Sequence, residues 1–524
     1  MHLSTTFIPA NFASRRHRTA RADVLPDYRA HWWVGEWTTA LTTVFELMAT
    51  ILLAGCASAL PAPTPGRADA PVTAQWHAPL PHGGQLTDLS QWWAQFEDPL
   101  MLRFVEAGQR VSPTLAQAAA RISDAQAARV ARGAALMPTL DASLSASRGR
   151  SELGSSIGTE SSAGLQLGWE LDLFGAGRAA ADSAQARLES SQAGWHDARI
   201  SVAAEVATTY VELRACEALV RQTEIDARSR AQTAQITRLA ANAGFQNPTA
   251  TDLAIASAAQ GRVTLIQRQA QCDSLIKALN ALTAQDETAL RRDLGTRTGQ
   301  LPEPIELAIT AMPAEVLAQR PDIYAAAREV VAASADADQV QALRWPRITL
   351  AGNIGTTRIN SGGVSANGTV WSIGPVTVTL PLFDSGARRA NAEAARARYT
   401  SATTVYAARL REAIRDVEIA LVRLDSTAQR SQDAVMAAEG FERSFIANEA
   451  SYQSGMVSLF ELEEALRSMI AAQSAVIDLR RERITAWITL YRALGGGWST
   501  TETQAARDAD VGNLANTSER QGTK

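Results

Sequence analysis

One pattern occurs twice along this chain of 524 residues: strand-like alternation, a glycine-containing turn and then a very long helical stretch. A helical pattern follows Gly177 without a proline until Asn247, and another runs from about Ala387 to Gln453. Each stretch holds about 65 residues, which at 1.5 Å per residue corresponds to a helix of roughly 100 Å. An elongated repeat of this kind need not divide into the compact domains that chain length alone suggests.

The two halves share landmarks at nearly constant spacing. Gly177 corresponds to Gly386 at an offset of 209 residues, and Gly244 corresponds to Gly455 at an offset of 211. Because Gly244 and Gly455 follow the long helical stretches, they are the predicted turn glycines of two helical hairpins. The predicted fold class is mainly α with a smaller β portion, built as a two-fold internal repeat of a β-hairpin and a long α-helical hairpin.

Alternating apolar and polar residues place a strand hairpin before each long helix. In 140–148, for example, Leu and Ala alternate with Asp and Ser. Residues 149–164 are rich in Gly and Ser and are predicted to form an exposed loop. The predicted strands cover about 139–148, 163–173, 347–358 and 370–381. The predicted helical hairpins cover about 175–296 and 385–494. The returning helices are shorter than the outgoing ones, and helices at 99–132 and 313–344 could stack end to end on them.

Composition argues against several functions. The chain is 46% hydrophobic and 20% charged with a net charge of -4, whereas a nucleic-acid-binding protein usually carries a basic excess. The six histidines are scattered, and none has metal-ligand spacing with a cysteine or another histidine. Because no set of nucleophile, base and metal ligands is recognisable, the chain is predicted not to be an enzyme and to need no cofactor.

The N-terminal segment is typical of an exported lipoprotein. Five arginines between positions 15 and 29 precede an apolar run that ends in Leu53-Ala54-Gly55-Cys56. This resembles a lipobox, in which the cysteine receives a covalent lipid. A chance Leu-Ala-Gly-Cys is the alternative, and the long stretch before Trp37 leaves open a later start codon. The predicted organisation is a signal sequence at 1–55, a tether at 56–90 with lipid on Cys56, a first repeat at 91–312, a second repeat at 313–498 and a disordered polar tail at 499–524.

The four predicted strands imply an oligomer. Strands of about ten residues can cross an outer membrane when tilted. Four strands cannot close a barrel, because the smallest filled barrels take about eight, and an open sheet in lipid exposes unpaired backbone groups. Several copies of the chain are therefore expected to share one barrel. The competing interpretation is a trimeric coiled-coil surface fibre or adhesin with a barrel anchor, but such proteins place one strand set at the C-terminus, whereas here the strands occur twice inside the chain.

Five motifs within about 91–498 carry a resemblance to a known family. They are Trp92-Trp93-Ala94-Gln95-Phe96-Glu97-Asp98-Pro99-Leu100, Arg320-Pro321-Asp322-Ile323, Trp345-Pro346-Arg347-Ile348, Pro381-Leu382-Phe383-Asp384-Ser385-Gly386 and Tyr452-Gln453-Ser454-Gly455. Together they resemble the TolC-like outer-membrane factors of tripartite efflux systems, in the lipoprotein branch that includes NodT and OprM. The resemblance implies a homotrimer in the bacterial outer membrane, with a twelve-stranded β-barrel on a periplasmic α-helical barrel. It also implies a passive exit duct for drugs, metals or other small molecules, served by a periplasmic adaptor protein and an inner-membrane transporter.

Acidic residues cluster near the two predicted helix turns, which the resemblance implies are the periplasmic tips where such channels close. Asp252 follows the first turn, and Glu461, Glu463 and Glu464 follow the second. Three copies around a common axis would form carboxylate rings that favour cations. The alternative is that these acids cap the helix N-termini and complement the helix dipoles on a solvated face.

Two cysteines lie on opposite sides of the first turn. Cys216 and Cys272 are 30 and 26 residues from Gln246, so an antiparallel hairpin places them within roughly 6 Å along the helix axis. Export to an oxidising compartment favours a disulfide between them. Two independent buried thiols are the alternative.

Overall fold

The computed structural model describes residues 78, 89–150, 157–303 and 320–498, all of which belong to one compact unit, Pro65–Lys524. The predicted signal sequence, Cys56, most of the tether and the polar tail lie outside these residues, so the predictions made for them stay predictions. None of the described helices combines the length and the apolar character that are needed to span a membrane.

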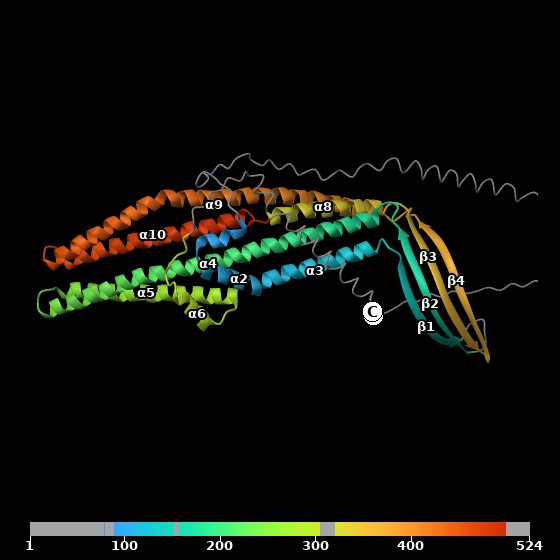
Figure 1. The fold of residues 1–524 in the computed structure, drawn as a ribbon, viewed down its shortest axis with the longest axis horizontal. Helices are drawn as coiled ribbons and strands as arrows, with labels where there is room; N and C mark the ends of the chain where they lie inside the picture. Colours follow the sequence, from blue (N-terminus) through green and yellow to red (C-terminus); the bar gives the residue numbers. More distant parts are fainter. Residues whose placement is uncertain (1–77, 79–88, 151–156, 304–319, 499–524) are drawn as a thin grey trace, which may run out of the picture. The chain divides into compact units, whose positions relative to one another are not determined.

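Two helices of 67 residues each dominate the structure (Figure 1). α4 (Ala176–Asn242) and α9 (Ala387–Gln453) are offset by 211 residues at both ends. Gly175 precedes α4 with φ 80° and Gly386 precedes α9 with φ 88°, a backbone conformation that only glycine adopts without strain. The equivalent of Gly386 is therefore Gly175, and the pairing with Gly177 at an offset of 209 is corrected.

Each long helix is followed by a shorter returning helix. α5 (Pro248–Thr283) returns along α4, and α10 (Leu459–Ala493) returns along α9 (Figure 1). We call the intervening residues, 243–247 and 454–458, the first and second turns. Both turns contain the predicted glycine, Gly244 with φ 79° and Gly455 with φ 75°.

Shorter helices extend or cover the long ones. The predicted helix at 99–132 is two helices, α2 (Pro99–Val111) and α3 (Pro113–Ala134), because Pro113 has no N–H to continue the first. The first return ends earlier than 296, since Ala284 closes α5 in a left-handed conformation and a separate helix, α6 (Glu287–Gly295), follows. α8 (Pro321–Ala342) packs against both α4 and α9, and α3 packs against α4.

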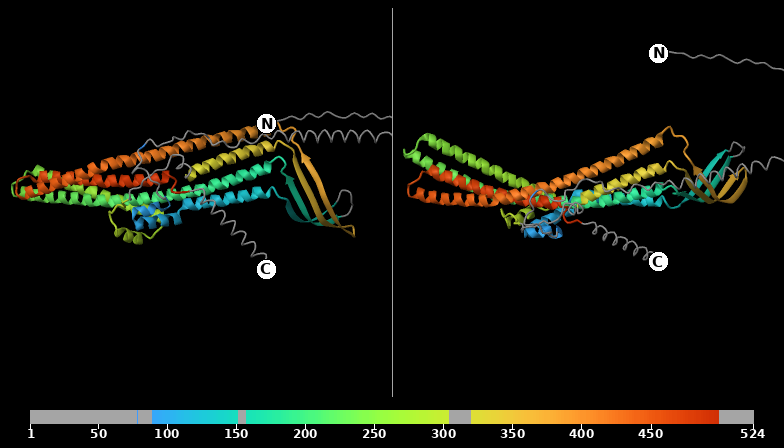
Figure 2. Two further views of the ribbon diagram at one scale, coloured as in Figure 1. Left: turned by 45° about the horizontal axis from the view of Figure 1, so that its top comes forward. Right: turned by 90° about the horizontal axis from the view of Figure 1, so that it is seen from above.

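The four strands form one antiparallel sheet in the order β1-β2-β3-β4 at one end of the helices (Figure 2). They are β1 (Thr139–Arg150), β2 (Ile157–Leu171), β3 (Arg347–Ser361) and β4 (Val364–Thr379). β2 and β4 each begin six residues earlier than predicted, and β1 and β3 end later. Backbone pairing extends these strands beyond the alternating side chains: Gly158, in the predicted loop, lies opposite Gly149 of β1 and Ser361 of β3.

The main hydrophobic core lies where α2, α5, α6 and a short 3-10 helix, η3 (Leu89–Phe96), pack around α4, α9 and α10. The Trp92 ring lies 6.0 Å from the Trp487 ring and 5.3 Å from the Tyr491 ring, between centroids. This aromatic cluster fixes the residues before α2 to the C-terminal part of α10. The Trp92-Trp93 pair thus has a packing role, because both side chains are buried.

Candidate functional site

The predicted site lies at the two turns, where the returning helices begin with different caps. At the first turn, the Asn247 side chain accepts a hydrogen bond from the Thr249 N–H at 3.0 Å. At the second turn, Ser458 and Glu461 form a capping box: the Glu461 N–H donates to Ser458 Oγ at 3.3 Å, and the Ser458 N–H donates to Glu461 Oε2 at 2.7 Å. Both caps satisfy backbone N–H groups that a helix N-terminus leaves unpaired.

Glu461 combines a cap with an exposed charge. The backbone hydrogen bond from Ser458 lowers the pKa of the Glu461 carboxyl below its ordinary value. The carboxylate therefore stays ionised to a lower pH than an ordinary glutamate does. The capping alternative holds at this position, and it leaves a negative charge at the second turn.

Glu463 does not lie on the exposed face of α10. Only 4% of the residue is exposed, and its Oε1 accepts hydrogen bonds from Ser229 Oγ at 2.5 Å and from Thr233 Oγ1 at 2.6 Å, both on α4. This corrects the expectation of a free carboxylate at this position, because the packing of α10 on α4 buries the side chain. Glu463 instead joins the second helical hairpin to the first.

The other two predicted acids are exposed. Glu464 exposes 73% of its side chain and lies 3.6 Å from Nη1 of Arg467. Asp252 lies near the start of α5, on the other hairpin, at an exposed position. The structure therefore gathers Glu461, Glu463 and Glu464 at the start of α10, with Glu463 turned toward α4 and the other two toward solvent. Within the described ranges, no group of three or more His, Cys, Asp or Glu side chains could hold a metal ion.

Two apolar residues at the turns are not among the predicted site residues. Phe245 is 83% exposed and follows Gly244, and Met456 is also exposed and follows Gly455. Their equivalent positions in the repeat are a sequence signal that could have identified them. Large exposed apolar side chains at equivalent places favour a contact surface for another protein.

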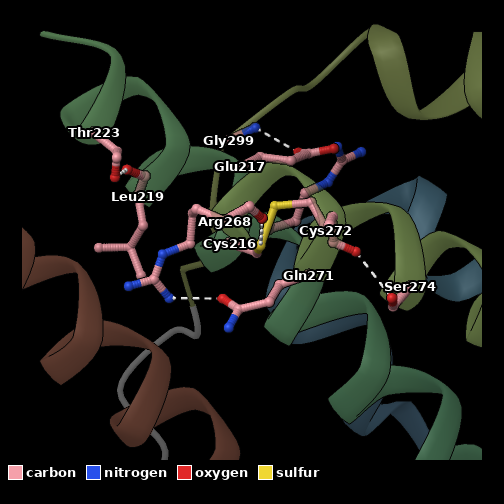
Figure 3. The surroundings of a disulfide bond; sticks show 11 residues. Cys216, Glu217, Leu219, Thr223, Arg268, Gln271, Cys272, Ser274 and Gly299 are labelled. Atoms are coloured by element: carbon pink, nitrogen blue, oxygen red, sulfur yellow. Dashed lines mark hydrogen bonds and ion pairs between the residues drawn. A yellow bond between two sulfur atoms is a disulfide. The ribbon is translucent and has the colours of Figure 1, made fainter. Parts of the chain in front are cut away.

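Cys216 of α4 and Cys272 of α5 are joined by a disulfide, with their Cα atoms 5.7 Å apart (Figure 3). Both residues are buried. Their pairing follows from the antiparallel course of the hairpin, in which residues at similar distances from the turn lie side by side.

A buried polar network near the disulfide is also absent from the predicted site. Tyr210 Oη donates a hydrogen bond to Asp98 Oδ2 at 2.8 Å, and burial raises the pKa of the Tyr210 hydroxyl. Arg214 lies with its guanidinium carbon 4.8 Å from the Tyr210 ring centroid, and its Nη1 donates to Glu217 at 2.8 Å and to the Leu294 carbonyl at 3.0 Å. The network connects the cap of α2 with α4 and α6.

Known proteins match this chain across both repeats. The family described as "Outer membrane efflux protein" matches residues 108–285 and 312–496. Outer membrane protein OprJ of Pseudomonas aeruginosa is 32% identical over 469 residues, which cover 87% of this chain and 96% of that protein. The pyoverdine export outer membrane protein OpmQ of the same species is 28% identical over 476 residues, covering 88% of this chain and 98% of that protein. The solved structure of the outer-membrane channel OprN is 26% identical, with a TM-score of 0.70 over 82% of this chain and 98% of that chain. The chain therefore belongs to the outer membrane efflux protein family and has the fold of its TolC-like channels.

Proposed function

We propose that three copies of this chain form the outer-membrane exit duct of a tripartite efflux system, with their sheets closed into a twelve-stranded barrel. The sheet carries this proposal. β1 and β4 are edge strands of the four-stranded sheet, 12 and 16 residues long, and all residues of β1 are exposed. In lipid, the unpaired backbone groups of such edges need partners, which the edges of neighbouring copies can supply.

The two turns lie at the opposite end of the helices from the sheet (Figure 1), and their exposed side chains favour binding of a partner protein there. Phe245 and Met456 present apolar surface there, which suits docking of a periplasmic adaptor protein. The adaptor would connect the duct to an inner-membrane transporter that supplies the energy. The family match covers both repeats, which supports a duct over a surface fibre. The relatives include a pyoverdine exporter and outer-membrane proteins of solvent and toluene efflux pumps, which suggests small molecules as the exported class.

The proposal is tested in the organism that carries the gene. Deleting the gene is expected to raise susceptibility to one or more compounds in a panel of drugs, dyes, solvents and metals, and a plasmid copy is expected to restore the wild-type value. The structure does not describe Cys56, so its lipidation needs a separate test. Palmitate labelling of the plasmid-encoded protein is expected, with Cys56→Ala as the unlabelled control. Unchanged susceptibility across the whole panel would contradict an efflux function.

Neutralising Glu461 and Glu464 together is expected to reduce the cation selectivity of single channels in planar lipid bilayers. Three copies of each carboxylate surround the proposed closed end, and such rings attract cations. Both residues are replaced with Gln, because a Gln at position 461 can still form the capping box. Because the pKa of Glu461 is lowered from 4.5, the wild-type preference for cations is expected to persist when the pH falls to that value.

Glu393→Gln is the matched control for the double variant. Glu393 is exposed near the opposite end of α9 and pairs with Arg389 at 2.9 Å, so its loss is expected to leave selectivity unchanged. Equal reversal potentials for wild type and the Glu461→Gln/Glu464→Gln variant would refute the carboxylate rings.

A further inference from the structure

The disulfide lies where the main core ends. Among the residues of α4 and α5 that belong to that core, Cys216 and Cys272 are the buried ones nearest to the first turn. Beyond them the hairpin continues through 217–242 of α4 and 248–271 of α5. We call residues 217–271 the distal arm. The disulfide closes the base of this arm.

The two helices of the distal arm are held together by small side chains. Ala234, Ala254 and Ala258 form its own buried cluster, and a Cβ placed on Gly261 would lie 3.3 Å from the Ala227 Cα. Short side chains allow the helices to lie close but bury little apolar surface, so they contribute little hydrophobic stabilisation. Leu219, at the base of the arm, is buried, whereas Leu239, Leu253, Val263 and Ile266 are exposed.

Polar contacts fix the base of the distal arm, next to the disulfide. Glu217, next to Cys216, accepts a hydrogen bond from the Gly299 N–H at 2.7 Å (Figure 3). Arg221, one turn further, donates to the carbonyl of Thr298. The chain that follows α6 is therefore attached to the first two turns of the distal arm on α4.

We propose that the Cys216–Cys272 disulfide is a mechanical clamp that fixes the register of α5 against α4, so that the distal arm moves as one body when the channel opens. A slide of α5 by one helical turn is 5.4 Å. Because the slide runs along the helix axis, roughly at right angles to the present Cα separation of 5.7 Å, it would place the two Cα atoms about 8 Å apart, beyond the range that a disulfide spans. A tilt of the whole arm leaves the separation unchanged.

The clamp determines how a movement of the first turn is transmitted to the second helical hairpin. Ser229 and Thr233 lie in the distal arm and donate to Glu463 of the second hairpin. With the register fixed, a displacement of the first turn moves these two hydroxyls with it. Without the disulfide, small side chains and a hydrogen bond from Arg230 to Ser257 at 3.0 Å hold α5 to α4 within the distal arm. These contacts are weak enough for this part of α5 to shift, whereas Ile276 and Leu279 keep the C-terminal part of α5 in the main core. The inference rests on the proposed channel function and concerns its opening.

Hydrogen exchange of the full-length protein tests the clamp. In Cys216→Ser/Cys272→Ser, amides of 217–242 and 248–271 are expected to exchange about tenfold faster or more than in wild type, whereas α2 is expected to be unchanged. Cys216→Ala/Cys272→Ala is expected to show the same faster exchange. Since the alanine variant buries no hydroxyl groups, agreement between the two double variants attributes the effect to loss of the disulfide. Wild-type protein that is denatured without reduction should leave both cysteines unlabelled by a thiol reagent. Labelling at both, or equal exchange in all three proteins, would overturn the clamp.

Single-channel recording separates this inference from the proposed function. Both double variants are expected to open spontaneously more often than wild type. If wild type does not conduct at all, the channel proposal fails, while the exchange result still decides whether the disulfide holds the arm together. If neither variant folds, wild type is reduced in the folded state, and faster exchange confined to the distal arm is then the supporting result; exchange that stays at the oxidised rate overturns the clamp.

Discussion

Replacing Arg214 with methionine is expected to destabilise the protein by about 3–5 kcal/mol, the usual cost of removing one partner of a buried ion pair. The Arg214 side chain is 0% exposed, and it lies 2.8 Å from the Glu217 carboxylate. Methionine fills much of the space but donates no hydrogen bond, so the Glu217 charge and the Leu294 carbonyl each lose a buried donor. The measurement is the midpoint of thermal or urea unfolding of the purified protein, followed by circular dichroism.

Arg103→Met is the matched control. Arg103 on α2 also pairs with a carboxylate, that of Asp293 on α6 at 3.2 Å, but 61% of its side chain is exposed. Exposed pairs contribute about 0–1 kcal/mol, so this variant is expected to unfold close to wild type. If the two variants lose the same stability, the buried network around Arg214 has no special role.

The repeat, the strand hairpins and the turn glycines could be predicted because each depends on local chemistry. Gly244 and Gly455 end their helices in a conformation that glycine adopts readily. The start of β2 could not be predicted from side-chain alternation, because residues such as Gly158 are strand residues only through pairing with two neighbouring strands. Pairing with neighbouring strands thus makes these residues part of β2, although their composition alone predicts a loop.

The candidate site was predictable in position but not in the role of each side chain. Glu461, Glu463 and Glu464 are chemically alike in the sequence, and only the packing of α10 on α4 separates them. A local signal does exist: Glu463 precedes the buried Leu466 by three residues, so the helical period places both on one face. Arg214 offers no comparable signal, since an arginine within a long helix is far more often a surface residue.

Replacing Glu463 with alanine is expected to increase the open probability of the channel about 5- to 150-fold, if opening separates α10 from α4. The structure contains two hydrogen bonds to this carboxylate, from Ser229 and Thr233, which hold α10 against α4. Hydrogen bonds to charged groups contribute roughly 1.5–3 kcal/mol each. If about 1–3 kcal/mol of the preference for the closed state is lost, part of that sum, the population changes about 5- to 150-fold. Open probability is measured by single-channel recording in planar bilayers without any partner protein.

Glu464→Ala tests whether the effect comes from the contact or from charge alone. It removes the same charge one residue away, and both carboxylates lie near Arg467, Glu463 at 3.8 Å and Glu464 at 3.6 Å. Because Glu464 is largely exposed, an effect of less than about fivefold is expected. Glu463→Gln should fall between wild type and alanine, because the amide oxygen still accepts a hydrogen bond without the charge. If Glu464→Ala opens the channel as much as Glu463→Ala, repulsion between carboxylates controls closure; if only Glu463→Ala does, closure depends on the contact between the two hairpins.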